Sequence, residues 1–390
     1  MAHELGYAIL TPYSLSKSRT GGILARLISR TGLELVGARM FAPGIELVRQ
    51  YAEMLVTAND PQDRRIQELI RGYILKNFVP DSRTGRRRRV MLLVFRGEDA
   101  VRRVRSVVGN FSLDRMGGET IRDTYGDLVF DDHNQVIYFE PAVLAAPDAT
   151  EAQQKLKLWA RYSDTDGGLL QGVIPYPEGA QVQRTLVLIK PDNFRFPTGR
   201  PGNVIDFFSR TGLFIIGIKV HRMSVAEAEE FYAPVREVLR TRLTDVVATR
   251  AKAALEPELQ FEIPPAETRR LGEILSPLHA DWQFENIVKF MSGHSPHTCA
   301  DEDRTKPGTE KCIALVYEGP DAVRKIREVL GPTDPSKAPP GSIRREFGQT
   351  VMVNAAHASD SEENARRELK IIGFDHNHFR EDIEAHFGGL

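Results

Sequence analysis

The stretch SRTGLELVGARM, residues 29–40, recurs in the same chain as SRTGLFIIGIKV, residues 209–220. A second pair of similar stretches keeps the same order, with MLLVFRGEDAVRRVRSVVG at 91–109 and IALVYEGPDAVRKIREVLG at 313–331. The copies lie about 180 residues apart in the first pair and about 222 in the second. Repeats in one order at such spacing are typical of a duplicated domain. We therefore expect two copies of one fold.

Each copy has the same order of expected strands and helices. In the second copy, apolar and β-branched runs typical of strands occur at 184–190, 213–223, 312–319 and 349–357. Segments with helical periodicity and a final glycine occur at 202–212, 321–331 and 359–373. This order predicts an α+β fold with two ferredoxin-like (split βαβ) sandwich domains, each an antiparallel sheet with helices packed on it.

Local signals fix some helix ends in the second copy. Ser224 and Glu227 have the spacing of a capping box, and Asp321 precedes a helical run that ends at Gly331. We expect Asp321 to cap that helix. The stretch IVKFM, 287–291, is expected to form a short helical segment.

Composition marks the boundary between the copies. Residues 163–181, SDTDGGLLQGVIPYPEGAQ, are rich in glycine, proline and aspartate, as linkers are. We expect a first domain at 1–165, a linker at 166–183 and a second domain at 184–390. Two insertions, at about 233–281 and 293–311, lengthen the second domain.

The bulk composition is that of a globular protein. Of 390 residues, 41% are hydrophobic and 27% are charged, and the formal net charge is −1. Overall charge therefore does not favour binding to nucleic acid or to an acidic membrane. We see no signal-peptide pattern and no apolar run of about 20 residues, so a cytoplasmic protein is expected. Two cysteines cannot form a disulfide framework.

One histidine, His357, stands in NAAHASDS, residues 354–361, between an expected strand and a capped helix. A neutral imidazole is a competent nucleophile near neutral pH, because its unperturbed pKa is about 6.5. Ser359, Asp360 and Glu368 can orient the ring. Taken alone, however, this segment favours a structural histidine that is hydrogen-bonded in a turn.

Several cations stand where a phosphate group could be bound. Lys190 ends a strand before Pro191, Arg327 lies on an expected helix and Arg344 lies in GSIRREF. Arginine forks suit bidentate binding of phosphate, and the hydroxyl group of Thr333 can donate to a phosphate oxygen. Taken singly, each of these residues also fits an ordinary solvated surface.

Together these segments resemble the nucleoside diphosphate kinase family. Its domains show a strand ending in I-K-P-D, a segment like L-G-x-T-x-P, a T/S-I-R turn and N-x-x-H-x-S-D-S. Here these stand in family order as IKPD (189–192), LGPTDP (330–335), SIR (342–344) and NAAHASDS (354–361). Four motifs in register are specific, whereas H-x-S-D alone is weak. The internal matches extend the resemblance to residues 1–162.

The resemblance implies a phosphotransferase with a ping-pong reaction. His357 would take the γ-phosphoryl group of a nucleoside triphosphate and pass it to a nucleoside diphosphate. Glu368 would hold the imidazole, Lys190 would act beside it, and Tyr232 would lie close to it. The implied nucleotide-binding residues are Lys190, Phe284 (which stacks on the base), Arg327, Thr333, Arg344 and Asn354. Mg²⁺ would be carried by the nucleotide phosphates, so no protein metal ligand is expected.

Three features depart from the family pattern. Asn193 replaces a usual glycine after Pro-Asp, and Ala358 replaces a glycine after the histidine. The insertion at 233–281 separates Tyr232 from Phe284. These departures bear on nucleotide affinity and access more than on the chemistry.

The first copy is expected to lack a working site. Thr11 stands at the position of Lys190 and Phe111 at that of Thr333, whereas Arg105 and Arg122 match Arg327 and Arg344. At the position of His357 we expect Gln135 or Ile137. The nearby His133 lacks the Ser-Asp-Ser context of a nucleophile.

Two further patterns leave alternatives open. The run RRRR at 86–89, with Arg83 nearby, is a basic patch that could bind nucleic acid, although a solvated loop fits it better. A zinc site could use the four residues His294, His297, Cys299 and Cys312, although their spacing is irregular.

We interpret the chain as a nucleoside diphosphate kinase with one working site in the second copy. The alternative is a non-enzymatic nucleotide-binding or scaffold protein on the same duplicated fold. We expect nucleoside di- and triphosphates as partners, and we expect neither nucleic acid nor a membrane. Because single-domain relatives form oligomers, we expect either a homo-oligomer or a pseudo-dimer within one chain.

Overall fold

The computed structural model describes residues 3–111, 118–133 and 135–390, and the chain forms two compact units. The first unit comprises Met1–Val220 and Ile313–Leu390, and the second comprises His221–Cys312. Both copies of the repeat lie in the first unit. The second unit contains the insertions that were expected in the second copy.

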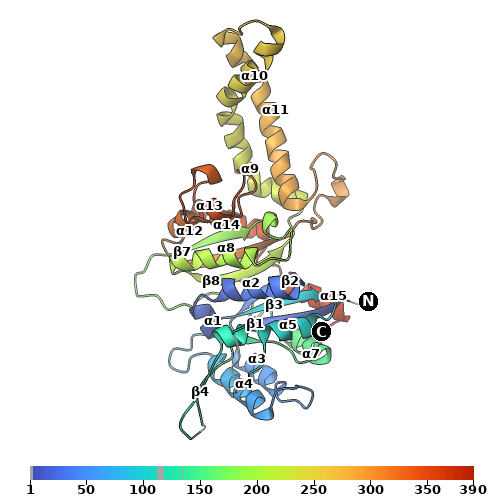
Figure 1. The fold of residues 1–390 in the computed structure, drawn as a ribbon, viewed down its shortest axis with the longest axis vertical. Coiled ribbons are helices and arrows are strands. Elements are labelled where there is room, and N and C mark those ends of the chain that lie inside the picture. Colours follow the sequence, from blue (N-terminus) through green and yellow to red (C-terminus); the bar gives the residue numbers. More distant parts are fainter. Residues whose placement is uncertain (1–2, 112–117, 134) are drawn as a thin grey trace. The chain divides into compact units, whose positions relative to one another are not determined.

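Each copy builds a four-stranded sheet in the first unit (Figure 1). The first sheet has the order β2-β3-β1-β6, and the second has the order β10-β7-β9-β8. The strands of the first sheet are β1 Glu4–Leu10, β2 Glu34–Phe41, β3 Val90–Gly97 and β6 Val143–Leu144; those of the second are β7 Val182–Ile189, β8 Phe214–His221, β9 Cys312–Pro320 and β10 Ala356–Ala358. Both orders place the first strand of the copy between its third and fourth strands. The predicted ferredoxin-like fold is therefore confirmed.

Helices pack on both sheets. The first copy contains α1 Pro12–Ser16, α2 Thr20–Thr31, α3 Ile45–Glu53, α4 Arg64–Asn77, α5 Ala100–Val108, α6 Ile121–Tyr125 and α7 Ala149–Arg161, with a separate hairpin of β4 Asp127–Phe130 and β5 Val136–Glu140. The second copy contributes α8 Arg200–Phe208, α12 Ala322–Leu330, α13 Ile343–Phe347, α14 Glu362–Ile372 and α15 His378–Phe387 to the first unit.

The two copies meet through equivalent helices, because α2 lies directly against α8 (Figure 1). Glycines make this close approach possible. A Cβ atom built on Gly202 would lie 2.3 Å from the backbone nitrogen of Ala25 and 2.3 Å from the carbonyl oxygen of Gly21. Gly21 in turn has no room beside the backbone of Asp206. Backbone therefore packs on backbone at the junction of the copies.

The C-terminal helix α15 packs on the first copy rather than on its own sheet. It contacts α7 and β2, and Phe379 and Ile383 join the buried core of the first copy. The guanidinium group of Arg380 donates to a carboxylate oxygen of Asp164 at 2.8 Å. The two copies thus share one core cluster.

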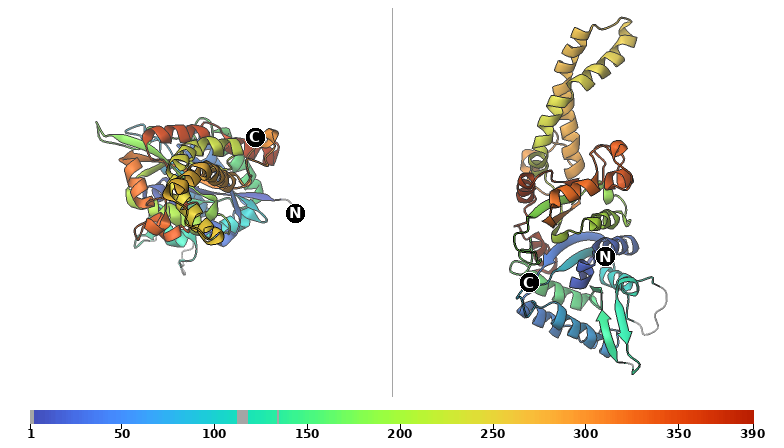
Figure 2. Two further views of the ribbon diagram at one scale, coloured as in Figure 1. Left: turned by 90° about the horizontal axis from the view of Figure 1, so that it is seen from above. Right: turned by 90° about the vertical axis from the view of Figure 1, so that its left-hand side faces the viewer.

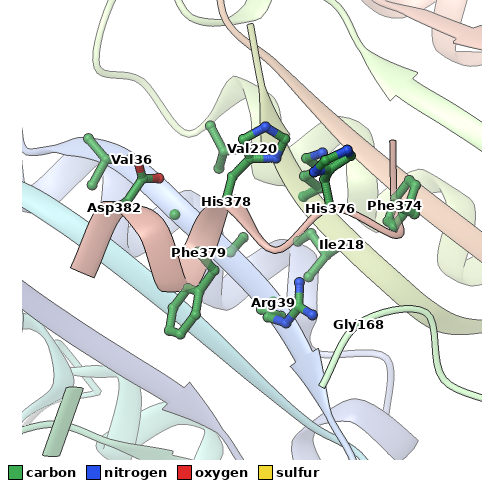
Figure 3. Close-up of a pocket in the computed structure, with 13 residues that line it drawn as sticks. Val36, Arg39, Gly168, Ile218, Val220, Phe374, His376, His378, Phe379 and Asp382 are labelled. Atoms are coloured by element: carbon green, nitrogen blue, oxygen red, sulfur yellow. The ribbon is translucent and has the colours of Figure 1, made fainter. Parts of the chain in front are cut away.

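A small cavity lies between β2, β8 and the segment that leads into α15 (Figure 3). Its lining includes Arg39, Lys219, His376 and His378, and its volume is about 20 Å³. Such a volume holds about one water molecule. The cavity is therefore too small for a nucleotide.

The second unit is mainly helical and contains α9 Val225–Arg242, α10 Thr244–Leu259 and α11 Pro265–Ser292. Helices α10 and α11 run side by side (Figure 2). They approach closely at Gly272, where a Cβ atom would lie 2.6 Å from the carbonyl oxygen of Thr244. Among the helices that the structure describes, none is long and apolar enough to cross a membrane.

Several local predictions are confirmed and others are wrong. The capping box of Ser224 and Glu227 is present in full at the start of α9. Helix α12 begins after Asp321, but the Asp321 side chain does not cap it and instead pairs with Arg324 at 3.1 Å. The stretch 287–291 belongs to the 28-residue helix α11 rather than to a short segment.

The strand expected at 349–357 is also shorter than predicted. Only Ala356–Ala358 is a strand, because Ala355 has a φ angle of 69°, a left-handed conformation that interrupts extended backbone. Residues 349–355 instead form a loop. That loop brings Asn354 into the candidate site.

The close packing of α2 on α8 predicts a stability effect. We expect Gly202→Ala to destabilise the protein by about 1–3 kcal/mol, because the added methyl group meets rigid backbone. Urea unfolding of the full chain measures this change.

Gly72→Ala is the matched control for this substitution. Gly72 lies in α4, and a Cβ atom there meets nothing within 4 Å. Alanine should therefore stabilise the helix by up to about 1 kcal/mol. Equal unfolding midpoints for the two variants would contradict the packing described here.

Candidate active site

His357 lies at the centre of β10, which is an edge strand of the second sheet. It pairs with Leu188 of β7, so its orientation is set by an antiparallel ladder. Its side chain is 23% exposed, which leaves the ring partly accessible to solvent. A histidine buried in the core would not allow access to a ligand, so this degree of exposure suits a reactive group.

A carboxylate holds one nitrogen of the His357 ring. Nε2 lies 3.1 Å from each carboxylate oxygen of Glu368, which is buried on α14. The hydroxyl group of Ser359 donates to the same carboxylate at 2.6 Å. A carboxylate at this nitrogen favours the tautomer with the proton on Nε2, because an anion accepts a hydrogen bond and cannot donate one. In that tautomer Nδ1 carries the ring lone pair.

The helix that carries Glu368 is positioned by its own cap. The side chain of Ser361 accepts a hydrogen bond from the backbone N–H of Asn364 at 3.0 Å, which begins α14. Gly373, with a φ angle of 64°, ends the helix. The stretch between His357 and Ser361 is therefore short and fixed at both ends.

Lys190 stands at the end of β7 and is almost fully buried. Its ammonium group donates to the carbonyl oxygen of Met352 and, at 2.9 Å, to the side-chain oxygen of Asn354. The Asn354 amide nitrogen donates to the carbonyl oxygens of Thr333 at 3.1 Å and Val351 at 2.8 Å. Asn354 thus connects the lysine to the loop after α12.

The electrostatic environment of Lys190 is unusual for a lysine. Burial lowers the pKa of Lys190 to about 8, and the positive charge of Arg344 acts in the same direction. The negative charge of Asp192 opposes this change. A buried cation near other cations is the arrangement expected of a site that binds an anion.

Arg344 lies in the first turn of the short helix α13 and bonds to two other segments of the site. It donates to the carbonyl oxygen of Gly331 at 3.0 Å and to that of Ala356 at 3.1 Å. The second bond reaches the residue next to His357. Arg327 and Thr333 are exposed at the end of α12 and in the loop that follows. A hydrogen bond from the side chain of Asn364 lowers the pKa of Asp360, and the charge of Arg327 acts in the same direction.

The structure thus brings six of the predicted residues into one neighbourhood: Lys190, Thr333 (through its carbonyl oxygen), Arg344, Asn354, His357 and Glu368. Arg327 contributes positive charge near Asp360. Tyr232 and Phe284 are buried in the second unit, so their roles beside His357 stay predictions. Sequence reasoning gave no role to Arg200, and it noted Asn193 only as a departure from the family pattern. The structure places both side chains beside this site.

The first copy has a leucine at the position of His357. His357 pairs with Leu188 across β10 and β7, and Leu144 pairs with the equivalent residue, Ile9, across β6 and β1. Glu368 follows His357 by eleven residues, and the residue at the same interval after Leu144 is Lys155. At these two matched positions, the first copy therefore has neither the histidine nor the carboxylate.

The prediction of Gln135 or Ile137 at this position is wrong. Ile137 lies in β5, which pairs with β4 rather than with the main sheet, and Gln135 directly precedes this strand. The hairpin adds residues to the first copy, so an alignment without gaps stops short of the fourth strand. His133 lies in the exposed turn of the same hairpin.

The two retained arginines of the first copy contact groups of its own chain. Arg122 donates to the side-chain oxygen of Gln62 at 3.0 Å, and its guanidinium group lies 4.9 Å from the ring centre of Phe111. Arg105 donates to a carboxylate oxygen of Asp60 at 2.6 Å. Both arginines therefore bind groups of their own chain.

The arginine run at 86–89 is largely engaged within the chain. Arg87 pairs with Asp166 at 2.9 Å, Arg88 lies 3.7 Å from Asp81, and Arg89 donates to the carbonyl oxygen of Ile215. These contacts show that the run helps to hold the fold together. They therefore argue against the alternative that the run binds nucleic acid.

The possible zinc ligands do not converge in the structure. His297 pairs with Glu285 at 2.5 Å, and the thiol of Cys312 lies 3.4 Å from the carbonyl oxygen of His221. Within residues 3–111, 118–133 and 135–390, no group of three or more His, Cys, Asp or Glu side chains could hold a metal ion.

Comparison with known proteins points to one family. A family model described as nucleoside diphosphate kinase matches residues 183–244 and 282–379. The nucleoside diphosphate kinase of Staphylothermus marinus is 30% identical over 190 residues, which are 49% of this chain and 92% of that protein. The corresponding protein of Helicobacter pylori is 31% identical over 191 residues, 49% of this chain and 94% of its own.

A solved structure also matches. That of the Aquifex aeolicus nucleoside diphosphate kinase covers 49% of this chain and 94% of its own, at 30% identity and a TM-score of 0.31. The family model matches the second copy and leaves out residues 245–281. The omitted residues fall within the expected insertion at 233–281.

The pKa of Lys190 predicts how anion binding depends on pH. Affinity for inorganic tripolyphosphate should be full below about pH 8 and should fall above it, because Lys190 then loses its charge. An ordinary lysine would keep its charge to about pH 10.4. Calorimetric titration of the full chain between pH 6.5 and 9.5 measures the effect.

Two variants show whether Lys190 causes this dependence. Lys190→Met should bind tripolyphosphate at least tenfold more weakly at pH 7 and lose the step near pH 8. Lys370→Met, in an exposed position on α14, should behave as the wild type does. A step that persists in Lys190→Met would assign the pH dependence to another group.

Proposed function

Because the chain belongs to the nucleoside diphosphate kinase family, we propose that it transfers the γ-phosphoryl group of a nucleoside triphosphate to a nucleoside diphosphate through a phosphohistidine at His357. The observation that carries this proposal is the contact of Nε2 with Glu368 at 3.1 Å. It favours a lone pair on Nδ1, the atom that would attack phosphorus. Buried Lys190 and nearby Arg344 supply positive charge beside it.

The first half of the reaction forms one bond and breaks another. The Nδ1 lone pair of His357 attacks the γ-phosphorus, and the bond from that phosphorus to the β–γ bridging oxygen breaks. The nucleoside diphosphate leaves with the electrons of that bond. Glu368 accepts the Nε2 hydrogen bond throughout and stabilises the positive charge that develops on the ring.

The second half reverses these steps with another nucleoside diphosphate. A terminal β-phosphate oxygen attacks the phosphorus of the phosphohistidine, and the nitrogen–phosphorus bond breaks. Nδ1 regains its lone pair, so the enzyme returns to its starting state. Positioning and charge neutralisation supply the rate enhancement in such transfers.

We assign the polar residues of the site to the phosphate groups and the sugar. The phosphates are bound by Lys190, Arg327, Thr333 and Arg344. Asn354 holds Lys190 and also binds the sugar hydroxyls. Phe284 and Tyr232 in the second unit take the base-stacking and histidine-facing roles. Mg²⁺ enters with the nucleotide as part of the substrate, where it neutralises phosphate charge. The first copy acts as a scaffold, and its packing through α2 and α8 is a pseudo-dimer within one chain.

Labelling with γ-³²P-ATP tests the proposal. The wild-type protein should acquire an acid-labile label, and His357→Ala should acquire none, because the nucleophile is lost. His133→Ala is the control, because its ring lies in an exposed turn of the first copy. Absence of label from the wild type would favour the scaffold alternative.

Glu368→Gln tests the part of the carboxylate. The amide cannot stabilise a positive ring, so labelling of His357 should slow by about 10- to 100-fold without being abolished. Rapid-quench measurement of label against time gives the rate. Glu363→Gln, in an exposed position on the same helix, should keep the wild-type rate. Equal rates for the two variants would remove Glu368 from the mechanism.

A further inference from the structure

Two side chains outside the predicted site form a brace next to it. The brace consists of Asn193, which follows the Ile-Lys-Pro-Asp motif, and Arg200, which begins α8. The side-chain oxygen of Asn193 accepts a hydrogen bond from Nε of Arg200 at 2.9 Å. Nη2 of Arg200 lies 3.2 Å from a carboxylate oxygen of Asp192.

Asn193 joins the two strands that carry the candidate catalytic groups. Its amide nitrogen donates to the carbonyl oxygen of Lys190 at 3.0 Å and to that of Ala355 at 2.7 Å. Lys190 ends β7, and Ala355 precedes β10 with its histidine. The side chain is 1% exposed, so water does not compete for these bonds.

Arg200 extends the brace to a third segment. Its Nη2 also donates to the carbonyl oxygen of Phe347, the last residue of α13. That helix carries Arg344. One guanidinium group therefore contacts the loop after Lys190 and the helix of Arg344, while its partner Asn193 contacts the start of β10.

The first copy provides an internal comparison for the brace. There the hydroxyl group of Ser14 donates to the carbonyl oxygen of Ala142 at 2.9 Å, as Asn193 does to Ala355. The first copy has a related arginine contact, because Arg19 donates to the carbonyl oxygen of Tyr125, the last residue of α6, as Arg200 does to Phe347. There, however, the guanidinium group of Arg19 lies 5.2 Å from the ring centre of Tyr13, whereas Arg200 bonds to Asn193 and Asp192. The contact with the short helix thus belongs to the fold of both copies, and the polar contacts with the loop after Lys190 accompany the copy with the histidine.

We propose that Arg200 is a positioning residue for phosphoryl transfer, holding the segments of Lys190, Arg344 and His357 at the spacing that a polyphosphate chain requires. This inference rests on the proposed function. Without the guanidinium group the three segments can separate. Lys190 and Arg344 then no longer lie at the spacing that suits one polyphosphate chain. Misplacement by about 1 Å costs up to about 100-fold in such sites. We expect the cost here mainly in polyphosphate affinity, because Arg200 contacts the loop after Lys190 and the helix of Arg344 directly, and the start of β10 only through Asn193.

The test compares Arg200→Met with Arg195→Met in the full chain. Arg195 lies in the same loop with an exposed side chain, so its variant controls for loss of charge near the site. Two quantities are measured: the dissociation constant for inorganic tripolyphosphate, and the rate of histidine labelling against ATP concentration. For Arg200→Met we expect the dissociation constant and the half-saturating ATP concentration to rise at least tenfold. The maximal labelling rate should fall by less than threefold.

Arg200→Lys separates positioning from general stability. Lysine can still pair with Asp192, but it lacks the fork that also reaches Asn193 and Phe347. Its melting temperature should stay within about two degrees of the wild type, while its half-saturating ATP concentration rises at least threefold. This variant also keeps the test valid if Arg200→Met does not fold.

The outcomes distinguish the inference from the proposed function. Failure of the wild type to become labelled refutes the proposed function, yet weaker tripolyphosphate binding by Arg200→Met still supports positioning of the anion site. Equal tripolyphosphate affinity in Arg200→Met and Arg195→Met overturns the inference, whatever the activity of the wild type. Wild-type kinetics in a folded Arg200→Lys overturn it as well.

Discussion

The three-residue ladder between β10 and β7 is the constraint on which the candidate site depends. Ala356, His357 and Ala358 pair with Ile189, Leu188 and Val187. Because side chains alternate along a strand, a slip of one residue would turn His357 to the opposite face of the sheet. An edge strand of this length has few ladder bonds. Arg344 at Ala356 and Asn193 at Ala355 add side-chain bonds that hold it in register.

The two copies differ in the groups that surround their cationic side chains. In the first copy Arg105 donates to a carboxylate oxygen of Asp60, and Arg122 donates to the side-chain oxygen of Gln62. In the second copy Lys190 is buried against neutral oxygens, and burial lowers its pKa to about 8. An anion that binds beside a buried cation stabilises the charged form of that cation. The difference lies in which loop residues surround the cations, since both sheets have the same strand order.

Local sequence predicted much of the fold and of the site. The repeat predicted two α+β domains, and apolar and β-branched runs placed the strands of the second sheet. His357, Ser359 and Glu368 lie within one short stretch, so the strand, the cap and the helix bring them together by local geometry alone.

What the sequence could not predict depends on contacts between distant residues. Arg200 reaches Phe347, which is 147 residues away in the chain, and nothing in the local pattern indicates this contact. Leu144 was missed because the hairpin of β4 and β5 changes the spacing between copies, so only the sheet register identifies the equivalent residue. The strand at 349–357 was predicted too long because periodicity does not reveal the positive φ angle of Ala355.

The position of α15 has a consequence for the order in which the chain folds during synthesis. Phe379 and Ile383 fill part of the core of the first copy, although more than 200 residues separate them from it in sequence. The N-terminal half therefore emerges from the ribosome with a hydrophobic gap that only much later residues can close. Until then, an apolar surface of the first copy would stay exposed to solvent and to chaperones.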